Sequence, residues 1–123
     1  MSGTKFFVDT NIVLYWLNGD RTLADLLHEN QIYLSFITEL ELLGYSKLTS
    51  VENIAIQEFL LDCKIVDINS EIKSQVIELR QRSKLKLPDS IILASAIYLD
   101  IPLLSADADF KKIDSINLIY YEQ

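Results

Sequence analysis

Short apolar runs typical of β-strands alternate with helical patterns along this chain, and this alternation is the strongest constraint on its fold. The strand-like runs are 5–9, 31–35, 64–68, 102–105 and 117–121. Strands that alternate with helices form a parallel sheet covered by helices on both faces. The sequence therefore predicts an α/β fold, a three-layer α/β/α sandwich over residues 1–123 with a central parallel sheet of about five strands.

Helical patterns fill the intervals between these runs. Gly19 is expected to stop the first helix, and Asp20, Ser50 and Ser70 are expected to cap later ones. Pro88 suits the first turn of a helix. The predicted helices run from Thr10 to Asn18, after Asp20, from about Thr38 past Leu48, after Ser50, after Ser70, from Pro88 to about Asp100, and from Asp107 to Lys112.

Composition excludes several classes of protein. Half of the residues are apolar, with three glycines and two prolines, which argues against disorder. A single cysteine, Cys63, and a single histidine, His28, leave no disulfide framework and no Cys- or His-based zinc site. No apolar stretch approaches the roughly 20 residues of a membrane span, and a strand begins within a few residues of the N-terminus. We therefore expect no membrane span, no signal peptide and a cytoplasmic location.

The net charge of −7 argues against a simple, sequence-independent nucleic-acid binder, because such proteins are usually basic. It does not argue against a nuclease, because catalytic carboxylates add negative charge that a bound metal offsets. An acidic surface is also compatible with a basic partner.

Asp9 directly follows the apolar run 6–8. A buried, ionised carboxylate at the end of a strand is costly unless something uses its charge. A purely structural alternative is that Asp9 caps the next helix. Three more acids, Glu41, Asp89 and Asp107, lie near helix starts beside strand-like sequence. The carboxyl ends of parallel strands are where ligands gather, so we expect these acids to meet there and to hold Mg²⁺ or Mn²⁺.

Two of these assignments have neighbouring alternatives. Glu39 and Glu41 point roughly 200° apart on a helix, so only one of them faces the site, and the apolar neighbours of Glu41 favour Glu41. Asp107 is nearer the strand end than Asp109, which remains an outer ligand or a helix cap. Asp89 opens a helix that is apolar on nearly every face and is expected to be buried.

Other polar residues complete the predicted site. Thr10 or Asn11 is expected to orient Asp9 by hydrogen bonding. A basic stretch before Asp89 is a candidate for contacts with RNA phosphates, although cations near a helix C-terminus are usually solvated. The stretch consists of Arg80, Arg82, Lys84 and Lys86.

Four segments together resemble the PIN-domain ribonucleases, most closely the VapC-type toxins of bacterial toxin–antitoxin pairs. They are 7–11 around Asp9, 35–42 around Glu41, 88–94 around Asp89, and 104–110 around Asp107. Ser105 stands where the family more often has threonine, and it keeps the hydroxyl. The resemblance implies a PIN-like nuclease domain over residues 1–123, one or two Mg²⁺ or Mn²⁺ ions, endonucleolytic cleavage of RNA, a homodimer, and a small antitoxin that blocks the acidic groove.

The predicted chemistry is hydrolysis of a phosphodiester by metal-activated water, with Asp9 and Asp89 as principal ligands completed by Glu41 and Asp107. Two alternatives remain open. One is a non-catalytic interaction module on the same fold. The other is an acidic-pocket phosphoryl-transfer domain, such as a receiver or a haloacid-dehalogenase-like phosphatase, although the phosphatase type wants an acid where this chain has Asn11.

Overall fold

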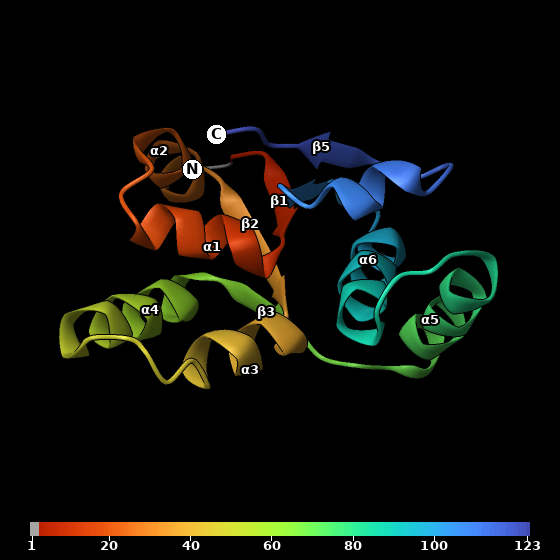
Figure 1. Cartoon of the computed structure of the whole chain (residues 1–123), viewed down its shortest axis with the longest axis horizontal. Helices are drawn as coiled ribbons and strands as arrows, with labels where there is room; N and C mark the ends of the chain where they lie inside the picture. The colour runs from red at the N-terminus through yellow and green to blue at the C-terminus, as the bar shows by residue number, and fades with distance from the viewer. Residues whose placement is uncertain (1–2) are drawn as a thin grey trace.

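Five parallel strands form a single sheet at the centre of the computed structural model, which describes residues 3–123 (Figure 1). The strands are β1 (Lys5–Val8), β2 (Gln31–Ser35), β3 (Lys64–Val66), β4 (Leu103–Ser105) and β5 (Leu118–Tyr120), in the order β3-β2-β1-β4-β5. All four pairings are parallel. Because β2 and β3 extend the sheet on one side of β1 and β4 and β5 on the other, the strand order switches between β1 and β4.

Helices cover both faces of this sheet. They are α1 (Thr10–Leu17), α2 (Arg21–Glu29), α3 (Phe36–Leu43), α4 (Ser50–Asp62), α5 (Ser70–Arg82), α6 (Leu87–Leu99) and the 3₁₀ helix η1 (Ala108–Lys112). Figure 1 shows α1, α2 and α4 on one side of the sheet and α5 and α6 on the other. The predicted α/β/α sandwich with a five-stranded parallel sheet is confirmed.

Two apolar cores, one on each face, hold the layers together. Successive residues of a strand point to opposite faces, so Phe7 packs with α5, α6 and η1, while Val8 packs with α1, α2 and α4. Both side chains are fully buried. The alternation along β1 therefore fixes the position of Asp9, the next residue, at the carboxyl edge between these two cores.

Several predicted boundaries were wrong, and local hydrogen bonds explain each difference. The third helix does not run from Thr38 past Leu48: it begins at Phe36, because the Ser35 side chain accepts from the Ile37 N–H, and it ends at Leu43, before Gly44. Thr49 and Asn69, rather than Ser50 and Ser70, cap α4 and α5. β3 stops at Val66, and the Asp67 carboxylate then accepts from the Ile68 N–H.

The other helix boundaries lie close to the predicted ones. Asp20 caps α2 as expected, by accepting a hydrogen bond from the Leu23 N–H. Pro88 lies in the first turn of α6, which ends at Leu99, and the next residue, Asp100, has a left-handed backbone conformation. Within residues 3–123, no helix combines the length and the apolar character that crossing a membrane requires.

Candidate functional site

Four carboxylates lie in one region at the carboxyl edge of the sheet, beside the switch in strand order, close enough for the charge of each to act on at least one other. Asp9 follows β1 and Asp107 lies just beyond β4, while Asp89 lies in the first turn of α6 and Glu41 on α3. The Asp9 N–H donates to the carbonyl of Leu104, 3.0 Å away, which extends the β1–β4 ladder to the site. The four acids selected from the sequence are therefore brought to one region of the molecule.

Asp9 is the most buried acid of this group, with 5% of its surface exposed. Burial raises the pKa of its carboxyl to about 6, and the charges of Asp89 and Asp107 act in the same direction. Hydrogen bonds from Ser105 Oγ (2.6 Å) and from the Thr10 N–H (2.8 Å) oppose this rise. Asp9 also caps α1, so its structural role and its place in the acidic site coexist.

Asp89 is linked electrostatically to all of the other acids. Partial burial raises the pKa of its carboxyl, and the carboxylates of Asp107 and Glu41 raise it further, whereas the charge of Lys86 opposes them. Acids that raise one another's pKa carry mutual repulsion that a cation would relieve.

Glu41 is exposed but held in place. The Thr10 hydroxyl donates to Glu41 Oε1 over 2.6 Å, which links the start of α1 to α3. The hydroxyl oxygen of Thr38 lies 3.0 Å from that of Thr10 and is fully buried. Sequence reasoning did not assign Thr38 to the site, although its position three residues before Glu41 places the two on one face of α3.

Ser105 connects the two acids that lie next to β1 and β4. Its buried hydroxyl donates to Asp9 Oδ2 and accepts from the Asp107 N–H over 3.0 Å.

Asp107 caps η1 by accepting from the Asp109 N–H, whereas Asp109 pairs with Lys112 at 3.5 Å. The charge of Asp107 acts on both Asp9 and Asp89, and that of Asp109 on Asp89. These observations favour Asp107 over Asp109. Asn11 accepts a 3.5 Å hydrogen bond from the Ala106 N–H.

Of the four cations in the basic stretch, one lies close to the acids, one contacts other residues, and the other two lie on α5 and in the connection that follows it. Arg82 lies 3.5 Å from Glu78 and donates to the carbonyl of Asp114. Arg80 shares the last turn of α5, and Lys84 lies exposed in the following connection. Lys86 occupies the position before α6 and lies close enough to Asp89 for its charge to affect that carboxyl.

Comparison with known proteins gives a family and a set of similar folds. The model of the PIN domain matches residues 6–116. The chain belongs to the PIN domain family. It is 31% identical to a chain of a toxin–antitoxin complex from Klebsiella pneumoniae, with a TM-score of 0.81, covering 95% of this chain and 98% of that one. A comparison with curated proteins gave no match.

Two further solved structures show the same fold at lower identity. VapBC2 from Rickettsia felis bound to a promoter DNA fragment is 22% identical with a TM-score of 0.83, covering 97% of this chain and all of that one. VapBC-1 from nontypeable Haemophilus influenzae is 19% identical with a TM-score of 0.81, covering 95% and 98%. The resemblance stated from the sequence is confirmed for the PIN family and its fold.

The donor set of this PIN domain fits a hard cation. It consists of carboxylates, two of which accept hydrogen bonds from hydroxyl groups. Carboxylate oxygens are the ligands that Mg²⁺ and Mn²⁺ prefer. Asp9 is buried, and the ion pairs found within residues 3–123 join Glu78 to Arg82 and Asp109 to Lys112, so neither neutralises it. The acids form an open arrangement, since no three Asp, Glu, His or Cys side chains of the described part make a group ready to hold a metal ion.

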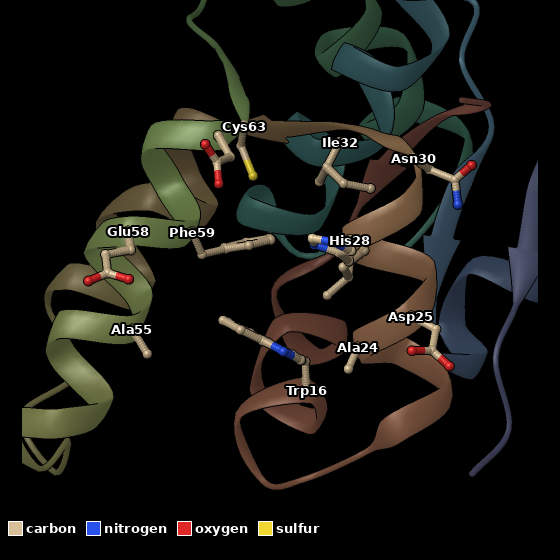
Figure 2. Close-up of a pocket in the computed structure, with 12 residues that line it drawn as sticks. Trp16, Ala24, Asp25, His28, Asn30, Ile32, Ala55, Glu58, Phe59 and Cys63 are labelled. Atoms are coloured by element: carbon tan, nitrogen blue, oxygen red, sulfur yellow. The ribbon is translucent and has the colours of Figure 1, made fainter. Parts of the chain in front are cut away.

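A hollow of about 740 Å³ lies between α1, α2 and α4, away from these acids (Figure 2). Trp16 and Phe59 face each other across it with ring centroids 4.9 Å apart. Its lining also includes His28, Cys63 and three acids, Asp25, Glu58 and Asp62. Burial raises the pKa of the Cys63 thiol to about 12, with the Asp62 charge adding to the effect, so this thiol is a poor nucleophile at neutral pH.

Proposed function

We propose that this PIN domain is a metal-dependent endoribonuclease and the toxin of a toxin–antitoxin pair. The observation that carries the proposal is a nearly buried carboxylate, Asp9, that lacks an ion-pair partner among those found in the described residues and lies within reach of the charges of Asp89 and Asp107. Membership of a family of nucleases supports the hydrolytic activity, and similarity to chains of toxin–antitoxin complexes supports the biological role.

Asp9, Glu41, Asp89 and Asp107 would hold one or two Mg²⁺ or Mn²⁺ ions. When bound, such an ion lowers the pKa of a coordinated water and stabilises negative charge at the phosphorus centre. The contributions of the chain itself are positional. Ser105 and the Thr10 N–H fix both oxygens of Asp9, and Thr10 restrains the otherwise exposed Glu41.

RNA reaches this acidic site only if cations offset its phosphate charge. Lys86 is the cation of the basic stretch whose charge acts on Asp89, so we assign it a contact with a phosphate next to the scissile bond. Arg80 and Arg82 lie in the last turn of α5 and Lys84 in the connection to α6, and they would contact more distant phosphates, with Arg82 first releasing Glu78.

The proposed protein partners are a small antitoxin and a second copy of the chain. The net charge of −7 favours a basic antitoxin, and the hollow beside Trp16 and Phe59, with its three acids, suits an apolar segment flanked by cations. For a homodimer, α3 and α4 offer exposed apolar side chains, namely Leu40, Leu43, Val51 and Ile54. Light scattering of the purified chain tests the dimer: a monomer at all concentrations would reject it.

The decisive experiment for catalysis incubates the purified protein with a mixed RNA pool in Mn²⁺ and in EDTA. Asp89→Asn should abolish the cleavage that Mn²⁺ supports, because Asp89 is a proposed ligand. Glu122→Gln, which removes an exposed acid outside the site, is the matched control and should cleave like the parent. Equal cleavage by Asp89→Asn and the parent would reject the proposal and identify a contaminating nuclease.

A non-catalytic interaction module is the second candidate, because no closed metal-binding group is present within residues 3–123. Such a module would not bind Mn²⁺ at the acids. Calorimetric titration of the parent with Mn²⁺ separates the two functions: saturable binding lost in Asp9→Asn favours the nuclease, and no heat at millimolar Mn²⁺ favours the module. The PIN family match gives no support to the phosphoryl-transfer alternative.

A further inference from the structure

A chain of hydroxyl groups runs from the interior of the protein to the Glu41 carboxylate. Thr38 Oγ1 and Thr10 Oγ1 are 3.0 Å apart, and Thr10 Oγ1 is 2.6 Å from Glu41 Oε1. Thr38 is fully buried, Thr10 is partly buried and Glu41 is exposed. The chain also joins two elements, because Thr10 opens α1 while Thr38 and Glu41 lie on α3.

The proton positions in this chain follow from the number of donors. A threonine hydroxyl carries one proton and can accept two. The shorter contact, to a carboxylate, is the stronger one and takes the proton of Thr10. The distance between the two hydroxyls fits donation in either direction, and with the Thr10 proton given to Glu41 we assign the donation from Thr38 to Thr10.

We propose that Thr38 is a positioning residue that aims the Thr10 hydroxyl at Glu41 and so presents this carboxylate to the metal-binding site. An exposed glutamate has many rotamers and gains little from a solvated contact. A buried, β-branched threonine has a restricted side-chain rotamer. Because Thr38 holds the Thr10 hydroxyl and Thr10 bonds to Glu41, the Glu41 side chain is also restricted, although it would otherwise move freely in water.

This role parallels that of Ser105, whose buried hydroxyl holds Asp9 at 2.6 Å. Groups that orient metal ligands by hydrogen bonding typically change metal affinity by about 10- to 100-fold when removed. The part of the inference that concerns metal affinity rests on the proposed function, whereas the hydrogen-bond chain itself does not.

The test compares Thr38→Val, which keeps the branched shape and removes the donor, with Thr38→Ser, which keeps the hydroxyl. Calorimetry with Mn²⁺ alone should show affinity weakened about 10- to 100-fold in Thr38→Val and largely restored in Thr38→Ser. In RNA cleavage at saturating Mn²⁺, kcat should fall in Thr38→Val while KM for RNA changes little. Equal Mn²⁺ affinity in Thr38→Val and the parent, or equal weakening in both variants, would overturn the proposal.

A measurement without metal separates this proposal from the proposed function. In EDTA, the Glu41 carboxyl carbon resonance should shift in Thr38→Val and return toward the parent value in Thr38→Ser. If the parent binds no Mn²⁺ and this pattern is still seen, the hydrogen-bond chain stands and the nuclease proposal fails. An unchanged Glu41 resonance in Thr38→Val rejects the chain.

If Thr38→Val does not fold, an NMR measurement on the parent protein tests the proposal. A buried hydroxyl that donates to Thr10 should exchange slowly, so the Thr38 hydroxyl proton should be visible in NMR spectra and close in space to the Thr10 side chain. Absence of that signal in the folded parent would reject the proposal.

Discussion

Replacing Asp9 by asparagine should stabilise the metal-free protein at neutral pH. The folded-state pKa of Asp9 is raised from 3.8 to about 6, mainly by burial. At about 1.4 kcal/mol per pKa unit, this two-unit difference corresponds to a destabilisation of about 3 kcal/mol once the group is ionised in both states. Asparagine has nearly the same shape, can accept from the Thr10 N–H and can donate to Ser105, without the charge.

The sign of the effect depends on pH. Well below pH 4 the carboxyl is protonated in both states, so Asp9 adds nothing to the pH dependence. Between about pH 4 and pH 6 the folded state binds more protons than the unfolded state, so stability falls as the pH rises. The parent and Asp9→Asn should therefore differ little near pH 4, and the advantage of Asp9→Asn should grow to at most about 3 kcal/mol by pH 7.5.

Urea unfolding in EDTA at several values between pH 4 and pH 7.5 measures this difference directly. Glu122→Gln removes one exposed carboxylate and is the control for the change in net charge. Most contributions from other titrating groups cancel when the unfolding free energy of the parent is subtracted from that of Asp9→Asn at each pH. If this difference is constant across the pH range, burial does not penalise the ionised Asp9, and the electrostatic basis of the proposed metal site is wrong.

Three further results are expected. Mn²⁺ should raise the melting temperature of the parent but not of Asp9→Asn, because a ligand that binds only the folded state stabilises it; an equal rise in both would contradict the site assignment. Lys86→Gln should weaken RNA binding and lower the salt slope by about one, whereas Lys84→Gln should do less; equal losses would refute the special place of Lys86. Thr49→Ala removes the capping box with Glu52 and should cost about 1 kcal/mol in urea unfolding; no loss would show that the cap contributes little.

The fold could be predicted because its signals are local and repeated. Alternation of apolar runs and helical patterns placed all five strands, and the predicted bounds 31–35 are those of β2. The boundaries that failed depended on single hydrogen bonds. Ser35 is both the last residue of β2 and the N-cap of α3. Residue propensities assign it to only one of these elements, so the start of α3 was predicted too late. Ser50 and Ser70 are each preceded by another good cap, and the sequence alone does not decide between such neighbours.

Three of the four acids, Asp9, Asp89 and Asp107, could be selected from the sequence because each stands at a junction between elements, where a charge has no ordinary place in a core. Glu41 lies within α3 and was selected over Glu39 because of its apolar neighbours. The hydroxyl groups behind the four acids could be selected only in part. Ser105 and Thr38 both lie in segments that resemble the PIN family, but nothing in the segment 35–42 indicates that Thr38 contacts Thr10 across 28 positions of sequence. Such a contact depends on how α1 packs against α3, which local patterns do not encode.

The arrangement of charges explains why a site of this kind needs a large core. Ionised Asp9 costs the fold about 3 kcal/mol, a sizeable fraction of the 5–15 kcal/mol that typically stabilises a domain. The two apolar cores on either side of β1 must offset this cost before any ligand is bound. A bound cation would remove the repulsion between Asp9, Asp89 and Asp107, so the protein should gain stability at the place where it gains activity. Neutralising Asp9 by mutation relieves the same repulsion and removes a ligand, so stability and catalysis should change in opposite directions at this residue.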